Sequence, residues 1–333
     1  MARIVRFHEF GDAPVLRIEE VPDQPPAADE VQLAVEAIGL NRSEVLFRQG
    51  HYPLQRAQFP SRIGYEAAGV VTAVGDRVTG VKVGDHVGTV PAFNLSRYGV
   101  YGEVATVPGS AVALSPPGLN AAQRAAVWAA YATAYGGLID VGRIDSTSRV
   151  VIPAASSSVG IAAIQICRAE GAQAIALTRT AAKREALLAL GAHHVVVTDE
   201  EDPVERIRDV TDGAGLTLAF DPVVGPLFEQ LARASAPGAT LVVYGGLDQR
   251  EAVFPRGPVL GKNLWVRGYT VFPTVSDPAT FRRAQDYIWG GVHRGTLNPV
   301  VAREFHGLEQ IGAAQDYMES NAQIGKIVVR VAS

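Results

Sequence analysis

From residue 149 onward, short apolar runs alternate with segments whose apolar residues recur at helical spacing. Glycine, proline and short polar residues bound the apolar runs, which is typical of buried strands. Strands are predicted at residues 150–153, 174–177, 195–198, 216–221 and 240–244, and helices at 159–170, 181–190, 203–211 and 226–234. Strands that alternate with helices pair in parallel, so the pattern predicts a doubly wound α/β sheet of Rossmann type with helices on both faces.

The first part of the chain has a different pattern, in which short β-branched runs are separated by turn residues. Gly75-Asp76 and Gly84-Asp85 each follow a short apolar run and mark tight turns between antiparallel strands. Strands are predicted at residues 31–35, 67–74 and 100–107, and a last one at 326–331. We therefore predict a β-rich domain at residues 1–122, a Rossmann domain at 123–263, and a last segment of mixed pattern at 264–333.

The loop between the first strand and the first helix of the Rossmann domain is built from small residues. Ser156, Ser157, Ser158 and Val159 lie there, and Gly160 is the only glycine of the loop. Small side chains let the backbone approach a pyrophosphate, whose charge the N-terminus of a helix stabilises. We therefore predict that these four residues bind a dinucleotide cofactor. The alternative is an ordinary turn of small residues.

The end of the second predicted strand distinguishes NADPH from NADH. NAD-binding domains place a carboxylate there for the ribose 2′-hydroxyl. Residues 177–184 of this chain contain no acidic residue. They contain Thr178, Arg179 and Lys183 instead, which can bind a 2′-phosphate through hydroxyl and cationic donors. The sequence therefore predicts NADPH. The alternative is a solvated basic start of a helix, which the helix dipole disfavours.

The composition narrows the remaining classes of function. The 333 residues carry a net charge of −4, so no basic excess is present to neutralise nucleic-acid phosphates. Cys167 is the single cysteine, which excludes an intrachain disulfide and a zinc site of several thiolates. The longest uncharged run, residues 150–167, contains Pro153 and Gly160 and is typical of a strand, a turn and a helix rather than a membrane span. Because the N-terminus lacks the apolar run of a signal peptide, we expect a cytoplasmic protein that binds neither nucleic acid nor membrane.

Several local motifs are shared with one superfamily. They are Gly39-Leu40-Asn41-Arg42-Ser43-Glu44, Gln49-Gly50-His51-Tyr52-Pro53, Gly64-Tyr65-Glu66-Ala67-Ala68-Gly69, Thr133-Ala134-Tyr135, the turn at 154–160 and the segment 321–326. Over most of its length, the chain resembles the medium-chain dehydrogenase/reductase superfamily, in its zinc-free quinone oxidoreductase and enoyl reductase branch. The resemblance implies a GroES-like β-rich catalytic domain at residues 1–122, a Rossmann domain, and a return of residues 264–333 to the catalytic domain. It also implies a homodimer, for which a predicted edge strand at 266–272 offers a pairing surface.

The zinc-dependent relatives differ from this chain at their metal-ligand positions. Where they place two thiolates and a histidine, this chain has Asn41, Ala129 and Tyr65. Zinc with four nitrogen and sulfur ligands cannot be assembled at these positions, so no metal site is predicted. Without a Lewis acid to polarise an alcohol or a carbonyl, the resemblance favours reduction of a quinone or of an activated C=C bond. Glu66, beside the histidine position, is expected to pair with an arginine.

The resemblance also assigns roles to individual residues. Asn41 lies where relatives keep a residue beside nicotinamide and substrate, so its amide can donate to the oxygen that gains charge; the alternative is a turn-forming asparagine. Tyr52 matches a tyrosine proposed as the proton donor of enoyl-thioester reductases, and the alternative is a pocket-lining role. The residues that the resemblance places on the cofactor are Thr133, Ser157, Ser158, Val159, Tyr244, Gly245 and Lys326. Phe272 is a further candidate contact, which can also form an aromatic wall with Phe93, Tyr98 and Tyr101.

Together these features predict an NADPH-dependent, zinc-independent reductase. It would transfer hydride to quinones or to the C=C bond of α,β-unsaturated carbonyls, which are small electrophiles. Two alternatives stay open. An enoyl-thioester reductase needs a basic groove, for which Arg42, Arg48, Arg56 and Arg62 are candidates. A non-catalytic protein would bind NADPH without turnover. The physiological substrate and the choice between dimer and tetramer are not determined by the sequence.

Overall fold

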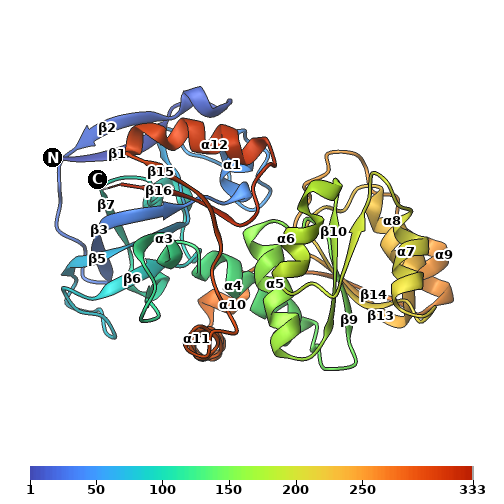
Figure 1. Ribbon diagram of the computed structural model, residues 1–333. Coiled ribbons are helices and arrows are strands. Elements are labelled where there is room, and N and C mark those ends of the chain that lie inside the picture. The colour runs from blue at the N-terminus through green and yellow to red at the C-terminus, as the bar shows by residue number, and fades with distance from the viewer. Residues whose placement is uncertain (332–333) are drawn as a thin grey trace. The chain divides into compact units, whose positions relative to one another are not determined.

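The computed structural model describes residues 1–331 and divides the chain into two compact units (Figure 1). The first unit consists of Met1–Ala130, Val275–Arg283 and the chain from Pro299 onward. The second unit consists of Tyr131–Thr274 and Ala284–Asn298. Compared with the predicted boundaries at 122/123 and 263/264, the second unit starts later and extends further. It extends further because β14 (Trp265–Gly268) is the sixth strand of its sheet.

A seven-stranded sheet forms the centre of the first unit. Its order is β15-β16-β3-β5-β6-β8, with β7 paired to β3, and all pairs except β15 with β16 are antiparallel. The strands are β3 (Glu30–Gly39), β5 (Glu66–Val74), β6 (His86–Thr89), β7 (Val104–Pro108), β8 (Val112–Leu114), β15 (Val301–His306) and β16 (Lys326–Arg330). The strands predicted at 31–35, 67–74 and 326–331 are confirmed. Because Val328 lies opposite Gly39, the end of the chain completes the sheet begun near its start.

A smaller sheet and short helices make up the rest of the first unit. The sheet has the order β2-β1-β4, with β1 (Ala2–Phe7), β2 (Arg17–Val21) and β4 (Ser61–Arg62). The helices are α1 (Arg42–Arg48), α2 (Leu95–Tyr98), α3 (Ala121–Arg124) and α12 (Ile311–Glu319), with a short 3-10 helix η1 (Ala13–Val15). The chain passes from one unit to the other within α4 (Trp128–Tyr135) and within α11 (Pro278–His293).

The two Gly-Asp turns form one long connection between β5 and β6. The backbone N–H groups of Gly75 and Gly84 donate to the carbonyls of Glu30 and Val71, each at 2.9 Å. No strand separates the two turns, because the apolar run between them is not buried; Val83, for example, is 60% exposed. The antiparallel pairing of the flanking strands β5 and β6 is confirmed, whereas the prediction that each turn joins two strands is wrong.

A six-stranded parallel sheet forms the centre of the second unit. Its order is β11-β10-β9-β12-β13-β14. The strands are β9 (Arg149–Ile152), β10 (Gln173–Thr178), β11 (His194–Val197), β12 (Leu216–Asp221), β13 (Ser235–Val243) and β14. The chain moves outward from β9 to β11 and then returns to β12 on the other side of β9, which is the doubly wound topology. The five predicted strands are confirmed. The strand predicted at 266–272 ends at Gly268, and Phe272 begins α10 (Phe272–Ser276) instead.

Helices cover both faces of the parallel sheet, as predicted. Figure 1 shows α5 (Ser158–Ala169) and α6 (Arg184–Ala189) on one face, and α7 (Pro203–Val210), α8 (Leu227–Ala234) and α9 (Arg256–Gly261) on the other. Val151, Leu231 and Leu241 belong to the buried apolar cluster between the sheet and these helices. Within residues 1–331, no helix is long and apolar enough to span a bilayer.

Candidate active site

Asn41 stands at the N-terminus of α1, directly after β3. Its backbone N–H donates to Glu44 Oε2 at 2.8 Å, which holds the first turn of the helix. Its side-chain Nδ2 donates to Glu44 Oε1 at 3.1 Å and to the Gly39 carbonyl at 3.2 Å. Its Oδ1 accepts from Lys326 Nζ at 2.7 Å. Both amide hydrogens are therefore used within the first unit, and donation to a substrate oxygen requires one of these bonds to be exchanged.

Lys326 and Glu66 form a buried ion pair beside Asn41. Their side chains are 1% and 0% exposed, and Lys326 Nζ contacts Glu66 Oε2. Glu66 Oε1 also accepts from the backbone N–H of Ala129 at 2.9 Å. Burial raises the pKa of Glu66, and the positive charge of Lys326 opposes this. The expectation of an arginine partner for Glu66 is wrong, because β16 brings Lys326 to it from the far end of the chain. The predicted contact of Lys326 with a cofactor stays a prediction.

Glu44 is a second buried carboxylate of the same network. It accepts from the Tyr101 hydroxyl and, at 2.7 Å, from the backbone N–H of Tyr65. Burial raises the pKa of Glu44, and these hydrogen bonds lower it. Tyr101 is fully buried, so the proposed aromatic wall loses this member to core packing. Asn41 connects the two carboxylates, since it bonds both Glu44 and the lysine that neutralises Glu66.

Tyr52 belongs to an aromatic cluster of the first unit. Its ring packs edge-on against Phe47 and Tyr65, with both pairs of ring centroids 6.4 Å apart. Tyr65 in turn lies 5.6 Å from Phe93. Tyr52 is partly exposed, while Tyr65 and Phe93 are buried. The packing places the phenol of Tyr52 at the edge of the cluster, which is compatible with both the proton-donor and the pocket-lining hypothesis.

The turn after β9 is tight and leads directly into the capped N-terminus of α5. Ala154 adopts a positive φ of 49°, and Ser157 caps α5, with its Oγ accepting from the Gly160 N–H at 3.0 Å. A Cβ on Gly160 would lie 2.6 Å from the Ala155 carbonyl oxygen, so only glycine fits there. The residues predicted to bind the cofactor here, Ser156, Ser157, Ser158 and Val159, are all partly exposed between buried neighbours.

The basic residues after β10 reach this turn. Lys183 Nζ donates to Ser156 Oγ at 2.9 Å, although 27 residues separate the two in sequence. Burial lowers the pKa of Lys183, and the charge of Arg179 lowers it further. Arg179 is exposed, whereas Thr178 is 8% exposed at the end of β10. The structure thus brings Ser156 and Lys183 together, with Arg179 nearby.

Tyr244 and Gly245 follow β13 at the carboxyl edge of the parallel sheet, where ligands lie in open α/β sheets. The Tyr244 ring stacks on Phe220 with centroids 4.0 Å apart, and its backbone N–H donates to the Asp221 carbonyl at 2.9 Å. Its hydroxyl is buried without a hydrogen-bond partner in the described part of the chain. Of the other predicted cofactor contacts, Thr133 lies in α4 and Phe272 at the start of α10.

Comparisons with known proteins agree with this architecture. The family model described as alcohol dehydrogenase GroES-like domain matches residues 27–120, and the one described as zinc-binding dehydrogenase matches residues 158–288. Quinone oxidoreductase 1 of Escherichia coli is 29% identical over 335 residues, which cover 98% of each protein. The solved structure of E. coli quinone oxidoreductase complexed with NADPH has a TM-score of 0.90 at 26% identity, over 99% of this chain and 100% of that one. The chain belongs to the medium-chain dehydrogenase/reductase superfamily, in its quinone oxidoreductase branch.

Other relatives of this chain are much longer proteins. The phthioceranic/hydroxyphthioceranic acid synthase of Mycobacterium tuberculosis is 38% identical over 215 residues, which are 65% of this chain and 10% of the synthase. The mycocerosic acid synthase-like polyketide synthase of the same organism is 31% identical over 326 residues, or 96% of this chain and 15% of the synthase. The chain thus spans only about a tenth to a seventh of the length of these relatives.

The positions that hold zinc ligands in other members of the superfamily surround the two buried carboxylates. The backbone N–H of Tyr65 donates to Glu44, and that of Ala129 donates to Glu66. Asn41 bonds Glu44 directly. In the described residues 1–331, no group of three or more His, Cys, Asp and Glu side chains is placed to hold a metal ion. A cationic lysine, Lys326, therefore stands at the centre of this part of the first unit.

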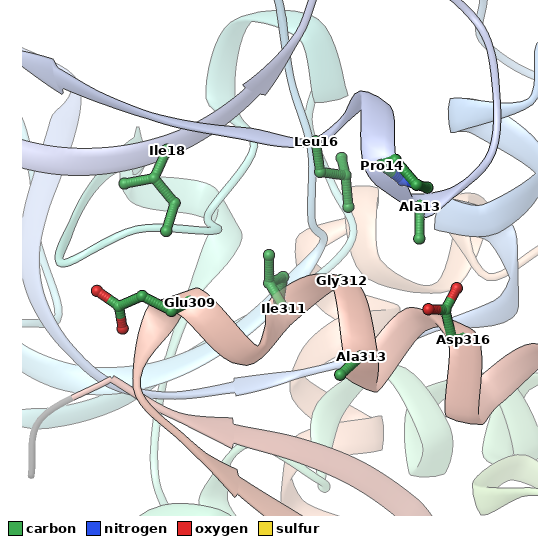
Figure 2. A pocket seen from close by; sticks show the side chains of 9 residues that line it. All are labelled: Ala13, Pro14, Leu16, Ile18, Glu309, Ile311, Gly312, Ala313 and Asp316. Carbon is green, nitrogen blue, oxygen red and sulfur yellow. The ribbon is translucent and has the colours of Figure 1, made fainter.

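A separate surface groove of about 410 Å³ lies on the first unit. Figure 2 shows it between the segment of Ala13, Leu16 and Ile18 on one side and α12, with Ile311 and Asp316, on the other. None of the predicted catalytic or cofactor-binding residues lines it. The groove therefore has no part in the chemistry derived from the network of Asn41, Glu44, Glu66 and Lys326.

Sequence reasoning missed three residues of the site. Glu44 has a recognisable signal, because an acidic residue three positions after an N-cap is typical of a capping box. Gln55 has no such signal, since its partners Tyr65, Phe93 and Leu95 come from other parts of the chain. Tyr65 stands out in the sequence only because zinc-dependent relatives have a histidine there. Its ring contacts with Tyr52 and Phe93 have no signal in the sequence.

Proposed function

We propose that the chain is an NADPH-dependent, zinc-independent reductase of quinones or of the C=C bond of α,β-unsaturated carbonyls. The observation that carries the proposal is the buried network of Asn41, Glu44, Glu66 and Lys326 at the superfamily's metal position. Catalytic zinc takes three protein ligands from Cys, His, Asp and Glu, whereas this network offers two carboxylates, one of which is already paired with the Lys326 ammonium group. Conjugated electrophiles accept hydride without a Lewis acid, so they fit this site better than alcohols.

NADPH is the cofactor in this proposal, and it supplies the hydride when bound. Lys183 and Ser156 would hold the 2′-phosphate, with Arg179 adding a second charge. The partly exposed turn of Ser157, Ser158 and Val159 would hold the pyrophosphate through backbone N–H groups. The presence of NADPH in the E. coli quinone oxidoreductase structure supports the same choice. Thr133, Tyr244, Gly245, Phe272 and Lys326 remain proposed contacts of the remaining cofactor atoms.

Tyr52 is the proposed proton donor for the reduced substrate. Tyr52 is partly exposed, whereas its neighbours Phe47 and Tyr65 in the aromatic cluster are buried. We propose that Asn41 mainly holds Lys326 and Glu44 in position, because its amide hydrogens already bond Glu44 and Gly39. Its donation to a substrate oxygen stays a proposal that requires the 3.2 Å bond to the Gly39 carbonyl to be exchanged.

An enoyl-thioester reductase is the second candidate, favoured by the match to polyketide synthases. The proposed basic groove is weak, however. Arg48 is fully buried and pairs with Glu319, and burial lowers the pKa of Arg62 to about 10. Arg42 bonds Asn321 and the Met318 carbonyl, and only Arg56 of the four is exposed. A small enone or quinone therefore fits the first unit better than a carrier-bound thioester.

The proposal includes a homodimer formed through β14. This strand is the last of the parallel sheet, and Trp265 and Val266 on it are 70% and 43% exposed. Unpaired backbone groups beside exposed apolar side chains favour pairing with a second copy of the same strand. The cytoplasmic location expected from the sequence stays a prediction.

The test measures the oxidation of NADPH by a panel of electrophiles. The loss of NADPH absorbance reports the rate. The panel contains benzoquinone, phenanthrenequinone, an alkenal, a cyclic enone, crotonyl-CoA and a saturated aldehyde. We expect turnover of the quinones or conjugated carbonyls and little turnover of the saturated aldehyde. Preferred reduction of crotonyl-CoA would support the second candidate, and NADPH binding without any turnover would support a non-catalytic role. Stoichiometric zinc in the purified protein would contradict the zinc-independent mechanism.

A further inference from the structure

Tyr65 lies directly beside the proposed proton donor Tyr52. The two rings meet edge-on, with centroids 6.4 Å apart and an interplanar angle of 69°. Tyr65 is 2% exposed, and its backbone is fixed by the hydrogen bond of its N–H to Glu44 Oε1. Its hydroxyl is therefore a buried polar group whose hydrogen-bond partners decide which way its proton points.

The orientation of the Gln55 side chain settles the first of these partners. Gln55 Oε1 accepts from the backbone N–H of Leu95 at 2.9 Å, and its Nε2 donates to the backbone carbonyl of Phe93 at 3.1 Å. A backbone N–H can only donate and a carbonyl can only accept, so the amide cannot be turned around. The same Nε2 lies 3.0 Å from the Tyr65 hydroxyl oxygen. Tyr65 must therefore accept a hydrogen bond from Gln55.

Because Tyr65 accepts from Gln55, its own hydrogen is available for donation to Tyr52. Burial raises the pKa of Tyr52, hydrogen bonding from Tyr65 opposes this, and the charge of Glu44 raises it again. Burial raises the pKa of Tyr65 far above that of a free phenol, with its interaction with Tyr52 acting in the same direction. The hydrogen bond between the two hydroxyls lowers the pKa of Tyr52 and raises that of Tyr65, as expected when Tyr65 is the donor and Tyr52 the acceptor.

We propose that Gln55 and Tyr65 are positioning residues, which form a one-way chain of hydrogen bonds that ends on the Tyr52 oxygen and turns the Tyr52 proton toward the substrate. The inference rests on the proposed function, in which Tyr52 donates a proton. Once hydride has reached the β-carbon of an enone, the Tyr52 O–H bond breaks and a C–H bond forms at the α-carbon. The electron pair of the O–H bond stays on the phenolate, which Tyr65 stabilises, and water returns a proton to it.

Two variants and one control test the chain of hydrogen bonds. Tyr65→Phe removes the donor and keeps the ring. Gln55→Glu replaces the donor to Tyr65 with a carboxylate, which accepts the Tyr65 proton and turns it away from Tyr52. The control is Tyr287→Phe, because the Tyr287 hydroxyl likewise donates to a partner distant in sequence, Glu170, but belongs to α11 and not to the aromatic cluster. A fluorotyrosine at position 52, titrated by fluorine NMR, reports the Tyr52 pKa independently of activity.

We expect both variants to raise the Tyr52 pKa by about one unit and to lower kcat on a cyclic enone about tenfold. KM for the enone and turnover of benzoquinone should change little, and Tyr287→Phe should behave like the wild type. An unchanged Tyr52 pKa in Tyr65→Phe would overturn the inference, as would an equal loss with enone and quinone, which indicates general damage. If Gln55→Glu does not fold, Tyr65→Phe alone decides.

The variant Tyr52→Phe separates failure of the inference from failure of the proposed function. If it is impaired on the enone while Tyr65→Phe is not, only the inference is wrong. If Tyr52→Phe is as active as the wild type, the proton-donor role of Tyr52 is wrong and the inference fails with it. Reduction of quinones by all variants would leave the assignment as a reductase intact in both cases.

Discussion

At the scale of single residues, the site is defined by buried charges that neutralise one another. Glu66 and Lys326 are both almost completely buried, and Asn41 joins them to Glu44. A buried charge is costly unless it is paired, so loss of one member leaves the other uncompensated. This interdependence makes the network a structural feature as well as a candidate for chemistry.

The ion pair predicts a large effect of Lys326→Met on stability. We expect the free energy of unfolding to fall by about 3–5 kcal/mol, because the Glu66 carboxylate loses its counter-charge. The double variant Lys326→Met/Glu66→Gln should recover part of this loss. Urea unfolding measures both effects. The control is Arg330→Met on the same strand, whose exposed pair with Glu304 at 3.6 Å should contribute less than about 1 kcal/mol. A loss no larger than that of the control would argue against the buried pair.

Lys183 predicts a specific effect on cofactor choice. Lys183→Met should raise the KM for NADPH about tenfold or more and leave the KM for NADH unchanged, because only NADPH carries the 2′-phosphate. Steady-state kinetics with both cofactors measures this. The exposed Lys82→Met is the matched control. An equal loss with both cofactors would show that Lys183 does not recognise the 2′-phosphate.

The same lysine gives the preference for NADPH a pH dependence. Burial lowers the pKa of Lys183, so its amine loses its charge at a lower pH than an ordinary lysine. The preference for NADPH over NADH should be complete below that pKa and should decline as the pH rises through it. Ratios of kcat/KM for the two cofactors, measured across the alkaline range, test this. A ratio that stays constant would remove Lys183 from cofactor selection.

At the scale of elements, the turn between β9 and α5 depends on close approach of the backbone. Gly160 in the first turn of α5 lies against Ala155, with no room for a Cβ. Ser157 then caps the helix, and the four small residues of the turn stay accessible. This explains why Gly160 is the only glycine of the turn. Position 160 needs glycine for packing, whereas serine fits at positions 156, 157 and 158.

Gly160→Ala should therefore damage the turn. A Cβ there would lie 2.6 and 2.7 Å from the oxygen and Cα of Ala155, which are backbone atoms that cannot rotate away. We expect a loss of stability of about 1–3 kcal/mol and weaker NADPH binding, measured by urea unfolding and by cofactor fluorescence titration. Gly257→Ala is the control, because nothing lies within 4 Å of its Cβ position in α9. Wild-type affinity in Gly160→Ala would mean that the turn does not bind the cofactor.

At the scale of the whole molecule, each unit is built around one large β-sheet, mainly antiparallel in the first unit and parallel in the second. The antiparallel sheet of the first unit takes its outer strands β15 and β16 from the end of the chain, while the parallel sheet of the second unit ends at the open edge of β14. An open edge with exposed apolar side chains is an aggregation risk unless another strand covers it. A second copy of the chain would cover it.

The homodimer proposed through β14 predicts that Val266→Lys yields a monomer. A charged side chain on the edge strand opposes pairing, while the sheet itself stays intact because Val266 is 43% exposed. Sedimentation velocity of the wild type and of the variant measures the mass. Val253→Lys is the matched control, since Val253 is 70% exposed but lies outside the strands. A monomeric wild type, or a dimeric Val266→Lys, would contradict the pairing.

Much of the fold could be predicted from the sequence, because local patterns determine it. The apolar period and turn residues of 149–244 predict five of the six strands of the parallel sheet and the helices between them, although β13 begins at Ser235, five residues before its predicted start. The prediction failed at Phe272, which begins a helix although a strand was expected, since apolar residues in a short run do not distinguish the two. The motifs around Asn41, Glu66 and the serine-rich turn were enough to indicate the superfamily.

The sequence by itself determined the classes of element, the superfamily, and the types of residue at the former metal position. Only the tertiary structure decided which groups meet there. Lys326 reaches Glu66 and Asn41 because β16 pairs with β3, and Gln55 reaches Tyr65 through a loop whose conformation the backbone of Phe93 and Leu95 fixes. The physical reason is that elements arise from local periodicity, whereas the direction of a hydrogen bond depends on partners distant in sequence.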